Sequence, residues 1–421
     1  MEVATREPTA PAVAPKGHVV VLHVGLAKNR GDRYILNLAL AYHEIGYRVT
    51  VVTDRFSKSE TSSYLDGFSD KIEVRFSAWW VPRSLLGLFK SSMAALKAAL
   101  MAFRVIFSPP EPKPDVVLLD TSMVALCILR VFTKHRLFYV AGFEELRNND
   151  ACYEHSRYYP NLLEAKWVKM ADEVIVETSG FVEIFKKSYP SVTRRPLVLY
   201  PSVDLGLRTE PEMDVRRIIP DLLDNTVIFL SVGKYRRSSN FKLAMDAFEV
   251  LLELIHDKPV TQRFQLVIAG DCKSAQENAW YRELRELAKE KICASQITLL
   301  KRLPTVHEKT LIAEAAIVIH PAKNDVQSDF VLKAMCLGKP IVATNKGIAS
   351  KILVNKISGV TTESEAYAVA EVLKKLMVSP HLQVFMGDIA RDAFRKSYSF
   401  ESMCEKLRAI MGRAQGSGAG E

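Results

Sequence analysis

The chain has 421 residues, of which 48% are hydrophobic and 25% charged, and its formal net charge is +9. This composition is typical of a globular protein with two sizeable cores, and it excludes an intrinsically disordered chain. A basic balance suits nucleic acid, an anionic membrane surface or a phosphate-bearing ligand. Because the Lys and Arg residues are dispersed and form no nucleic-acid-binding motif, we expect no nucleic-acid partner.

The N-terminal half alternates short apolar strands with helical segments. Residues 1–16 have no apolar core, so we expect a disordered tail and not a signal peptide. Strands are predicted at 18–24, 47–53, 72–77, 115–120, 136–142, 171–179 and 196–202, with helices such as 31–46 between them. This alternation predicts a doubly wound, Rossmann-like α/β domain over 17–203.

One helical segment of this half, residues 84–107, is amphipathic. Its basic residues Lys90, Lys97 and Arg104 are seven positions apart and therefore share one helical face, opposite a face of Leu, Met, Ala and Phe. Such a helix fits either a membrane interface or packing on its own sheet with the basic side chains in water. Both interpretations place the three basic side chains outside the core. We predict that they face a membrane surface. No uncharged apolar run reaches the roughly 18 residues that a membrane span needs.

The C-terminal half repeats the alternating pattern after a loop richer in Pro, Asp and Glu. This loop, 204–225, is predicted to be a linker, and strands are predicted at 226–234, 264–271, 297–303, 315–321 and 338–345. We therefore expect a second Rossmann-like domain over 226–395, and a C-terminal helix with a loose tail over 396–421. The predicted fold class is α/β, with two doubly wound domains facing across a cleft. Ligands of such sheets bind in the turns that follow the carboxyl ends of the strands.

Six segments carry a resemblance to a known family. In chain order they are AWWVPR (78–83), LFYVAGF (137–143), LYPSVD (199–204), SVGKYRRSSNFKLAMDAF (231–248), LVIAGD (266–271) and NDVQSDFVLKAMCLGKPIVATNKG (324–347). Together they resemble GT-B glycosyltransferases of the family-4 type. Within these they are most similar to the alpha-1,3/alpha-1,6-mannosyltransferases of the dolichol-linked oligosaccharide pathway.

This resemblance implies a reaction and its setting. The reaction would be retaining transfer of mannose from GDP-mannose to a mannosylated chitobiose on dolichyl diphosphate, an early step of N-glycan precursor assembly. It would need no metal or other cofactor, because basic side chains neutralise the departing diphosphate. The implied location is the cytosolic face of the endoplasmic reticulum membrane. The implied partners are a sugar nucleotide, a lipid-linked oligosaccharide, a membrane surface and other glycosyltransferases.

The resemblance assigns the donor to the C-terminal domain. The Arg and Lys positions that meet the diphosphate correspond to Lys234 and Ser239, so one of the two charges is missing. The neighbouring basic residues either supply a substitute or are ordinary solvated surface; they are Arg236, Arg237 and Lys242. Asp271 either approaches the nucleotide or caps a helix. Arg302 lies where the family brings a turn beside the base, although an ordinary surface position is an equal alternative.

A loop of the family, which corresponds to the segment that begins at 324, carries two acids separated by seven residues. The first corresponds to Asp325 and the second to Lys333, while an intervening glycine corresponds to Ser328. A carboxylate accepts hydrogen bonds from the vicinal ribose hydroxyls, whereas a lysine only donates. We therefore expect Lys333 to face the ribose position with reversed charge.

The N-terminal domain also departs from the family pattern. A glycine pair after the first strand corresponds to Asn29 and Arg30, with Gly31 one residue further on. A family histidine corresponds to Ala141, which cannot donate to a sugar hydroxyl. Ala141 and Asp325 are thus the residues that best match catalytic positions of the family, and no catalytic residue is assigned. His23, near the end of the first predicted strand, is expected to be structural.

These substitutions leave three functions open. The protein is an active GDP-mannose-dependent transferase with a rebuilt donor site, or a non-catalytic paralogue that assists or regulates active glycosyltransferases. The third alternative is a transferase with an altered donor, in which Lys333 meets an additional anionic group.

Overall fold

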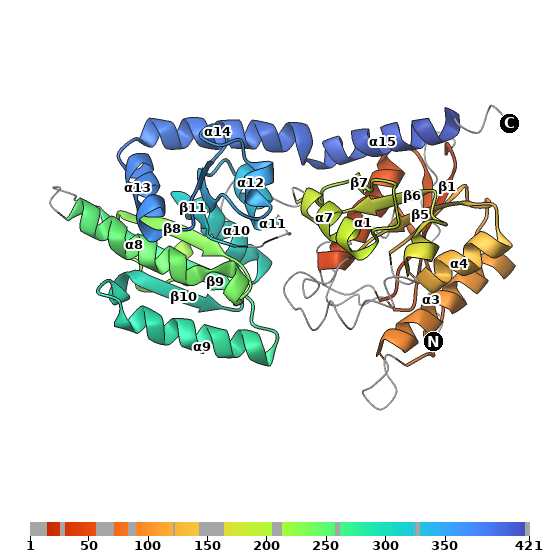
Figure 1. Ribbon diagram of the computed structural model, residues 1–421, viewed down its shortest axis with the longest axis horizontal. Coiled ribbons are helices and arrows are strands. Elements are labelled where there is room, and N and C mark those ends of the chain that lie inside the picture. The colour runs from red at the N-terminus through yellow and green to blue at the C-terminus, as the bar shows by residue number, and fades with distance from the viewer. Residues whose placement is uncertain are drawn as a thin grey trace. The chain divides into compact units, whose positions relative to one another are not determined.

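The computed structural model describes residues 15–25, 30–55, 71–82, 90–120, 123–142, 164–203, 213–256, 262–323, 325 and 329–416. The side chains of 30, 90, 91 and 414–416 are not among them. The chain divides into two compact units (Figure 1). Unit 1 comprises 1–202 and 400–421, and unit 2 comprises 203–399.

Unit 1 is built on a seven-stranded sheet in the order β3-β2-β1-β4-β5-β6-β7. Its pairings are all parallel. The strands are β1 (His18–Leu22), β2 (Arg48–Thr53), β3 (Glu73–Phe76), β4 (Val116–Leu119), β5 (Arg136–Val140), β6 (Glu173–Val176) and β7 (Leu197–Val198). The helices are α1 (Arg30–Glu44), α3 (Lys90–Phe107), α4 (Met123–Phe132), α7 (Ser179–Ser188) and α15 (Phe400–Gly416).

The central strands of unit 1 are buried because helices cover the sheet. β1 reads HVVVL and β4 reads VVLL, and every residue of both is buried. Such buried runs rich in Val and Leu are typical of parallel strands that are covered on both faces. The C-terminal helix α15 contributes to this core, since Leu407 and Met411 join the cluster that contains Leu38 and Tyr42 of α1.

Unit 2 is built on a six-stranded parallel sheet in the order β10-β9-β8-β11-β12-β13. The strands are β8 (Thr226–Val232), β9 (Arg263–Gly270), β10 (Ile297–Lys301), β11 (Ile317–His320), β12 (Ile341–Thr344) and β13 (Val360–Thr362). The α-helices are α8 (Phe241–Ile255), α9 (Ala275–Glu290), α10 (Thr305–Glu314), α11 (Asp329–Cys336), α12 (Ala349–Ile352), α13 (Ala366–Met377) and α14 (Pro380–Ser397). Three short 3₁₀ turns are η2 (Val215–Arg217), η3 (Arg237–Ser239) and η4 (Ala294–Gln296).

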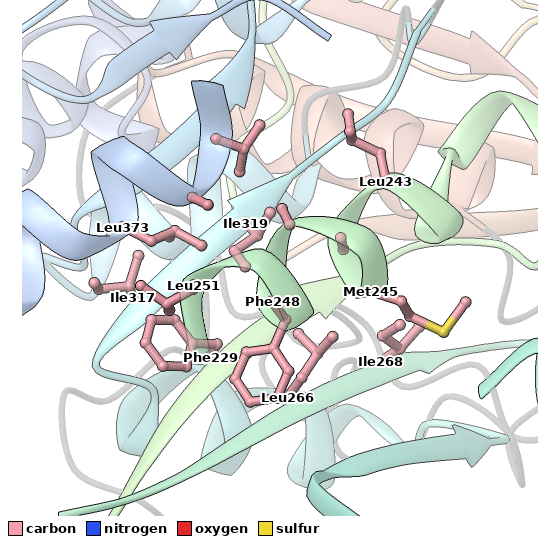
Figure 2. Packing of buried hydrophobic residues seen from close by; sticks show 14 of the residues in the cluster. Phe229, Leu243, Met245, Phe248, Leu251, Leu266, Ile268, Ile317, Ile319 and Leu373 are labelled. Carbon is pink, nitrogen blue, oxygen red and sulfur yellow. The ribbon is translucent and has the colours of Figure 1, made fainter. Parts of the chain in front are cut away.

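The core of unit 2 forms where α8 packs on the sheet. Figure 2 shows Phe248 and Leu251 of α8 directed toward Phe229 of β8 and Leu266 of β9, all of which belong to one buried cluster. The rings of Phe229 and Phe248 lie 5.7 Å apart between centroids. Burying an apolar side chain of this size stabilises the fold by about 1.5–3 kcal/mol.

Both sheets reverse their strand order once, between β1 and β4 in unit 1 and between β8 and β11 in unit 2. Because parallel crossovers are right-handed, such a reversal places successive helices on opposite faces of the sheet. The predicted fold class, with two doubly wound parallel α/β sheets, is confirmed.

The structure of helix α3 differs from the prediction for Lys90, Lys97 and Arg104. Lys97 is buried, and its Nζ lies 2.5 Å from Asp54 Oδ2. It shares the core face of α3 with Ala98 and Met101, while Arg104 is exposed. The prediction that Lys97 faces outward is therefore wrong, because a carboxylate at the end of β2 holds its charge inside unit 1. Lys90 begins α3, and its side chain lies outside the described residues.

Candidate functional site

The donor-side residues predicted from the sequence gather at one edge of unit 2. Lys234 follows β8, Asp271 follows β9, Arg302 follows β10 and Asp325 follows β11. These strands are neighbours in a parallel sheet, so the four residues lie at its carboxyl edge. This edge, at the point where the strand order reverses, is where doubly wound sheets bind ligands.

Two glycines of this edge allow backbone segments to touch. A Cβ on Gly270 would lie 1.8 Å from the carbonyl oxygen of Gly233, so any larger residue would push apart the turns after β8 and β9. Gly347 has φ +77° and would place a Cβ 3.1 Å from the backbone of Asp325. The adjacent Ile348 N–H donates to the Asp325 carbonyl at 2.8 Å. The turns after β11 and β12 are thus held together by backbone contacts that require glycine.

The turn after β8 carries the residues that the resemblance assigns to the diphosphate. Lys234 is exposed, and its carbonyl accepts a hydrogen bond from Ser239 Oγ at 2.6 Å. Arg237 is turned toward α9 instead. Its guanidinium lies 3.3 Å from Glu283 and 4.6 Å from the centroid of the Trp280 ring. The guanidinium is thus paired on α9 while the Arg237 side chain stays 79% exposed, and its role as a replacement charge stays a prediction.

Asp271 and Arg302 connect the turns after β9 and β10. Asp271 Oδ1 accepts from the Leu303 N–H at 3.1 Å, and the Arg302 N–H donates to the Gly270 carbonyl at 3.0 Å. The N-cap of α9 is Ser274 and not Asp271, because the Ser274 side chain accepts from the helix. Of the two alternatives for Asp271, helix capping is therefore wrong.

The loop after β11 contains the first acid of the predicted pair. Asp325 Oδ2 lies 3.2 Å from Nε2 of His320, the last residue of β11. Ser328 lies outside the described residues. The part of this loop that the structure describes therefore places Asp325 beside the turn after β12.

The second position of the pair, Lys333, is neutralised within the protein. Its Nζ lies 2.6 Å from Glu308 Oε2, and the two side chains are only 10% and 17% exposed. Glu308 lies in the first turn of α10, which follows β10 at the carboxyl edge. The predicted reversal of charge is therefore balanced by a carboxylate on a neighbouring helix, and Lys333 is not an isolated cation.

Two further lysines of this edge were not assigned to the site from the sequence. Lys323 follows β11 and Lys346 follows β12, and both are exposed. The Lys323 N–H donates to the Ser238 carbonyl at 3.0 Å, which ties its loop to the turn after β8. Their position directly after predicted strands was the signal that could have identified them.

The predicted residues of unit 1 are described only in part. Asn29 lies outside the described residues, Arg30 begins α1, and Gly31 is exposed in its first turn. Ala141 is buried after β5, where its N–H donates to the Ile175 carbonyl at 2.9 Å. Ala141 thus occupies the carboxyl edge of this sheet with no polar side chain.

A cavity of about 610 Å³ lies away from these residues. It is lined by η2, the start of β8 and Glu314, which places it at the amino edge of the sheet of unit 2. The donor residues lie at the opposite edge, so we assign the cavity no part in the site. Within the described ranges, no group of three or more His, Cys, Asp or Glu side chains is arranged to hold a metal ion.

Comparison with known proteins shows what this chain is similar to. Residues 216–393 match the family "Glycosyl transferases group 1". The chain is 24% identical over 406 residues to "Alpha-1,3/1,6-mannosyltransferase ALG2" of Mus musculus, covering 92% of this chain and 94% of the relative. It is also 24% identical over 413 residues to the protein of the same name from Dictyostelium discoideum, covering 94% and 97%. The chain is thus similar along most of its length to proteins named alpha-1,3/1,6-mannosyltransferases.

Solved structures establish the fold independently. The sucrose-phosphate synthase of Thermosynechococcus elongatus superposes with a TM-score of 0.71 at 13% identity, covering 96% of this chain and all of that one. A glycosyltransferase from Rickettsia africae ESF-5 gives a TM-score of 0.69 at 14% identity, covering 94% and 97%. The GT-B fold and the recognised resemblance are both confirmed.

Proposed function

We propose that this protein transfers mannose from GDP-mannose to a mannosylated chitobiose on dolichyl diphosphate. The observation that carries the proposal is the similarity to alpha-1,3/1,6-mannosyltransferases over 92–94% of the chain. It favours a transferase over a non-catalytic paralogue. The carboxyl edge of unit 2, with its glycine contacts and basic turns, supplies the features that a sugar-nucleotide site needs.

Lysines at the carboxyl edge would neutralise the diphosphate in this reaction. Lys234, Lys323 and Lys346 follow three neighbouring strands and are exposed. Positive charge aimed at a departing diphosphate stabilises the transition state in the absence of a metal. We propose these three lysines as the diphosphate-binding set.

The ribose hydroxyls would be met by Glu308. The resemblance calls for a carboxylate at the position of Lys333, and the carboxylate nearest to the Lys333 ammonium group is that of Glu308, 2.6 Å away. A carboxylate accepts from two vicinal hydroxyls whichever helix carries it. The ion pair also argues against an altered donor with an additional anionic group, because Glu308 already satisfies the charge of Lys333.

Calorimetric titration with GDP tests the donor assignment. The wild-type protein is expected to bind GDP, and replacing both Lys234 and Lys323 with Met is expected to weaken binding roughly tenfold or more, because two charge-assisted contacts are lost. Arg237→Met is the matched control, since its cation is already held by Glu283, and it should bind GDP as the wild type does. An absence of GDP binding at millimolar concentration would contradict the proposed function.

We further propose that unit 1 attaches peripherally to the cytosolic face of the endoplasmic reticulum membrane. Among the described residues, no helix is both long and apolar enough to cross a bilayer. An aromatic patch, which we define as Phe103, Phe107, Val131 and Phe132, lies at the ends of α3 and α4, and Phe107 and Phe132 are 78% and 60% exposed. The ring of Phe103 lies 6.0 Å from Phe107 and 6.3 Å from Phe132. Exposed aromatic side chains beside a basic residue, here Arg104, suit a lipid interface.

A second exposed aromatic pair follows β3. Ala78 adopts φ +57°, and the Val81 N–H donates to its carbonyl at 3.2 Å, so a tight turn buries Ala78 and Val81. The same turn leaves Trp79 and Trp80 exposed to solvent. Trp is the residue that most favours the boundary between lipid and water, which supports the same attachment.

Flotation with vesicles containing anionic lipid tests this attachment. Phe107→Ser combined with Phe132→Ser is expected to lower the ratio of vesicle-bound to free protein roughly tenfold, because two large apolar side chains no longer enter the interface. Val384→Ser combined with Phe385→Ser is the control, since these two residues of α14 are also well exposed. Equal flotation of the two double variants would contradict attachment through the aromatic patch.

A further inference from the structure

Two charged side chains meet where the strand order of unit 1 reverses. His23 follows β1 and Asp120 follows β4, and His23 Nδ1 lies 2.5 Å from Asp120 Oδ2. β1 and β4 are the adjacent strands between which the order changes direction. A ligand of a doubly wound sheet is expected at this point.

His23 is held from both sides. Its Nε2 lies 2.9 Å from Asp32 Oδ1 in the first turn of α1, and both residues are buried. Burial by itself lowers the pKa of His23, but the charge of Asp120 and the hydrogen bonds that the imidazole donates to both carboxylates raise it to about 10. His23 is therefore an imidazolium at neutral pH with both nitrogens engaged. It cannot act as a general base, and it orients the carboxylate of Asp120.

The second oxygen of Asp120 has no hydrogen-bond donor in the described part of the chain. This atom, Oδ1, is buried and accepts no hydrogen bond there. The same is true of Oδ1 of Asp54, which follows the neighbouring strand β2. A buried carboxylate oxygen without a donor is unfavourable, so a ligand that donates hydrogen bonds would stabilise it.

The charge of this cluster selects the kind of ligand. Asp32, Asp54 and Asp120 provide three carboxylates, and His23 and Lys97 provide two cations, which leaves a net charge of −1. An ionised carboxylate accepts hydrogen bonds and donates none. A neutral polyol fits such a site, whereas a phosphate or a carboxylate would be repelled.

We propose that Asp120 binds a hydroxyl group of the acceptor sugar, and that His23 and Asp32 are positioning residues that hold its carboxylate in place. This inference rests on the proposed mannosyl transfer. It adds to that function the residue of unit 1 that recognises the neutral acceptor.

The test measures binding of the soluble mannosyl-chitobiose trisaccharide by calorimetry and by saturation-transfer NMR. Asp120→Asn is expected to raise the dissociation constant of the trisaccharide roughly tenfold to a hundredfold, because a hydrogen bond to a charged group is lost. The matched control is Asp115→Asn. Asp115 precedes the same strand at the opposite edge of the sheet, where its Oδ2 accepts from the His18 N–H at 2.8 Å. This control is expected to bind the trisaccharide as the wild type does.

Kinetics separate a role in recognition from a role in folding. In the transfer reaction, Asp120→Asn and His23→Gln should raise the KM for the acceptor while the affinity for GDP stays unchanged. If Asp120→Asn fails to fold, Asp120→Glu keeps the charge beside His23 and is expected to show the same rise. Wild-type affinity of the folded variants for the trisaccharide, or a wild-type protein that does not bind it, would overturn the inference. A wild-type protein that binds the trisaccharide but neither GDP nor GDP-mannose would contradict the proposed function alone.

Discussion

Replacing Lys97 with methionine is expected to lower the free energy of unfolding by about 3–5 kcal/mol. The Lys97 ammonium lies 2.5 Å from Asp54, and the two side chains are only 2% and 3% exposed. Methionine fills a similar volume but leaves the Asp54 carboxylate buried without its cation. The second oxygen of Asp54 has no donor among the described residues, so nothing there compensates for the loss. Urea denaturation followed by circular dichroism measures the effect.

Two variants control for the loss of a basic side chain. Arg104→Met changes an exposed residue of the same helix, and its effect should stay within about 0.5 kcal/mol. Combining Lys97→Met with Asp54→Asn removes both charges and should recover much of the lost stability. If Lys97→Met were as stable as Arg104→Met, Lys97 would not be the buried partner of Asp54.

Replacing Glu308 with glutamine is expected to weaken GDP binding roughly tenfold, because the carboxylate proposed to meet the ribose is lost. The same change leaves the ammonium group of Lys333 without its partner. Since this pair is less deeply buried than that of Lys97, the loss of stability should be about 2–3 kcal/mol. Calorimetry with GDP and urea denaturation measure the two effects separately.

The charge-swapped variant Glu308→Lys/Lys333→Glu separates the two roles. It retains an ion pair between α10 and α11, and it moves the carboxylate to the position that the family resemblance assigns to the ribose. Stability should return to within about 1 kcal/mol of the wild type, and GDP binding should be restored. Unchanged GDP affinity in Glu308→Gln would remove Glu308 from the nucleotide site.

The positions of most strands along the chain were predictable because they depend on local patterns. Runs such as HVVVL and VVLL, bounded by polar turns, predict buried parallel strands. The order of motifs then located Lys234, Asp271, Arg302 and Asp325 after successive strands. Each of these residues is found at the carboxyl edge of unit 2.

The partners of the charged side chains could not be predicted in the same way. A spacing of seven residues shows that Lys97 and Arg104 share a face of a helix, but it does not show how deep each lies. Asp54, which draws Lys97 into the core, is 43 residues away in the sequence. Glu308 is 25 residues from Lys333, and the two meet only because α10 and α11 both begin at the carboxyl edge. Such pairs depend on tertiary packing, which the pattern of a single helix does not contain.

The most direct test of the proposed function is transfer of labelled mannose from GDP-mannose to a mannosylated chitobiose on a dolichyl diphosphate analogue. The purified protein is expected to extend the acceptor with retention of the anomeric configuration, and Lys234→Met combined with Lys323→Met should lose most of this activity. A protein that binds both substrates but forms no extended product would contradict the account.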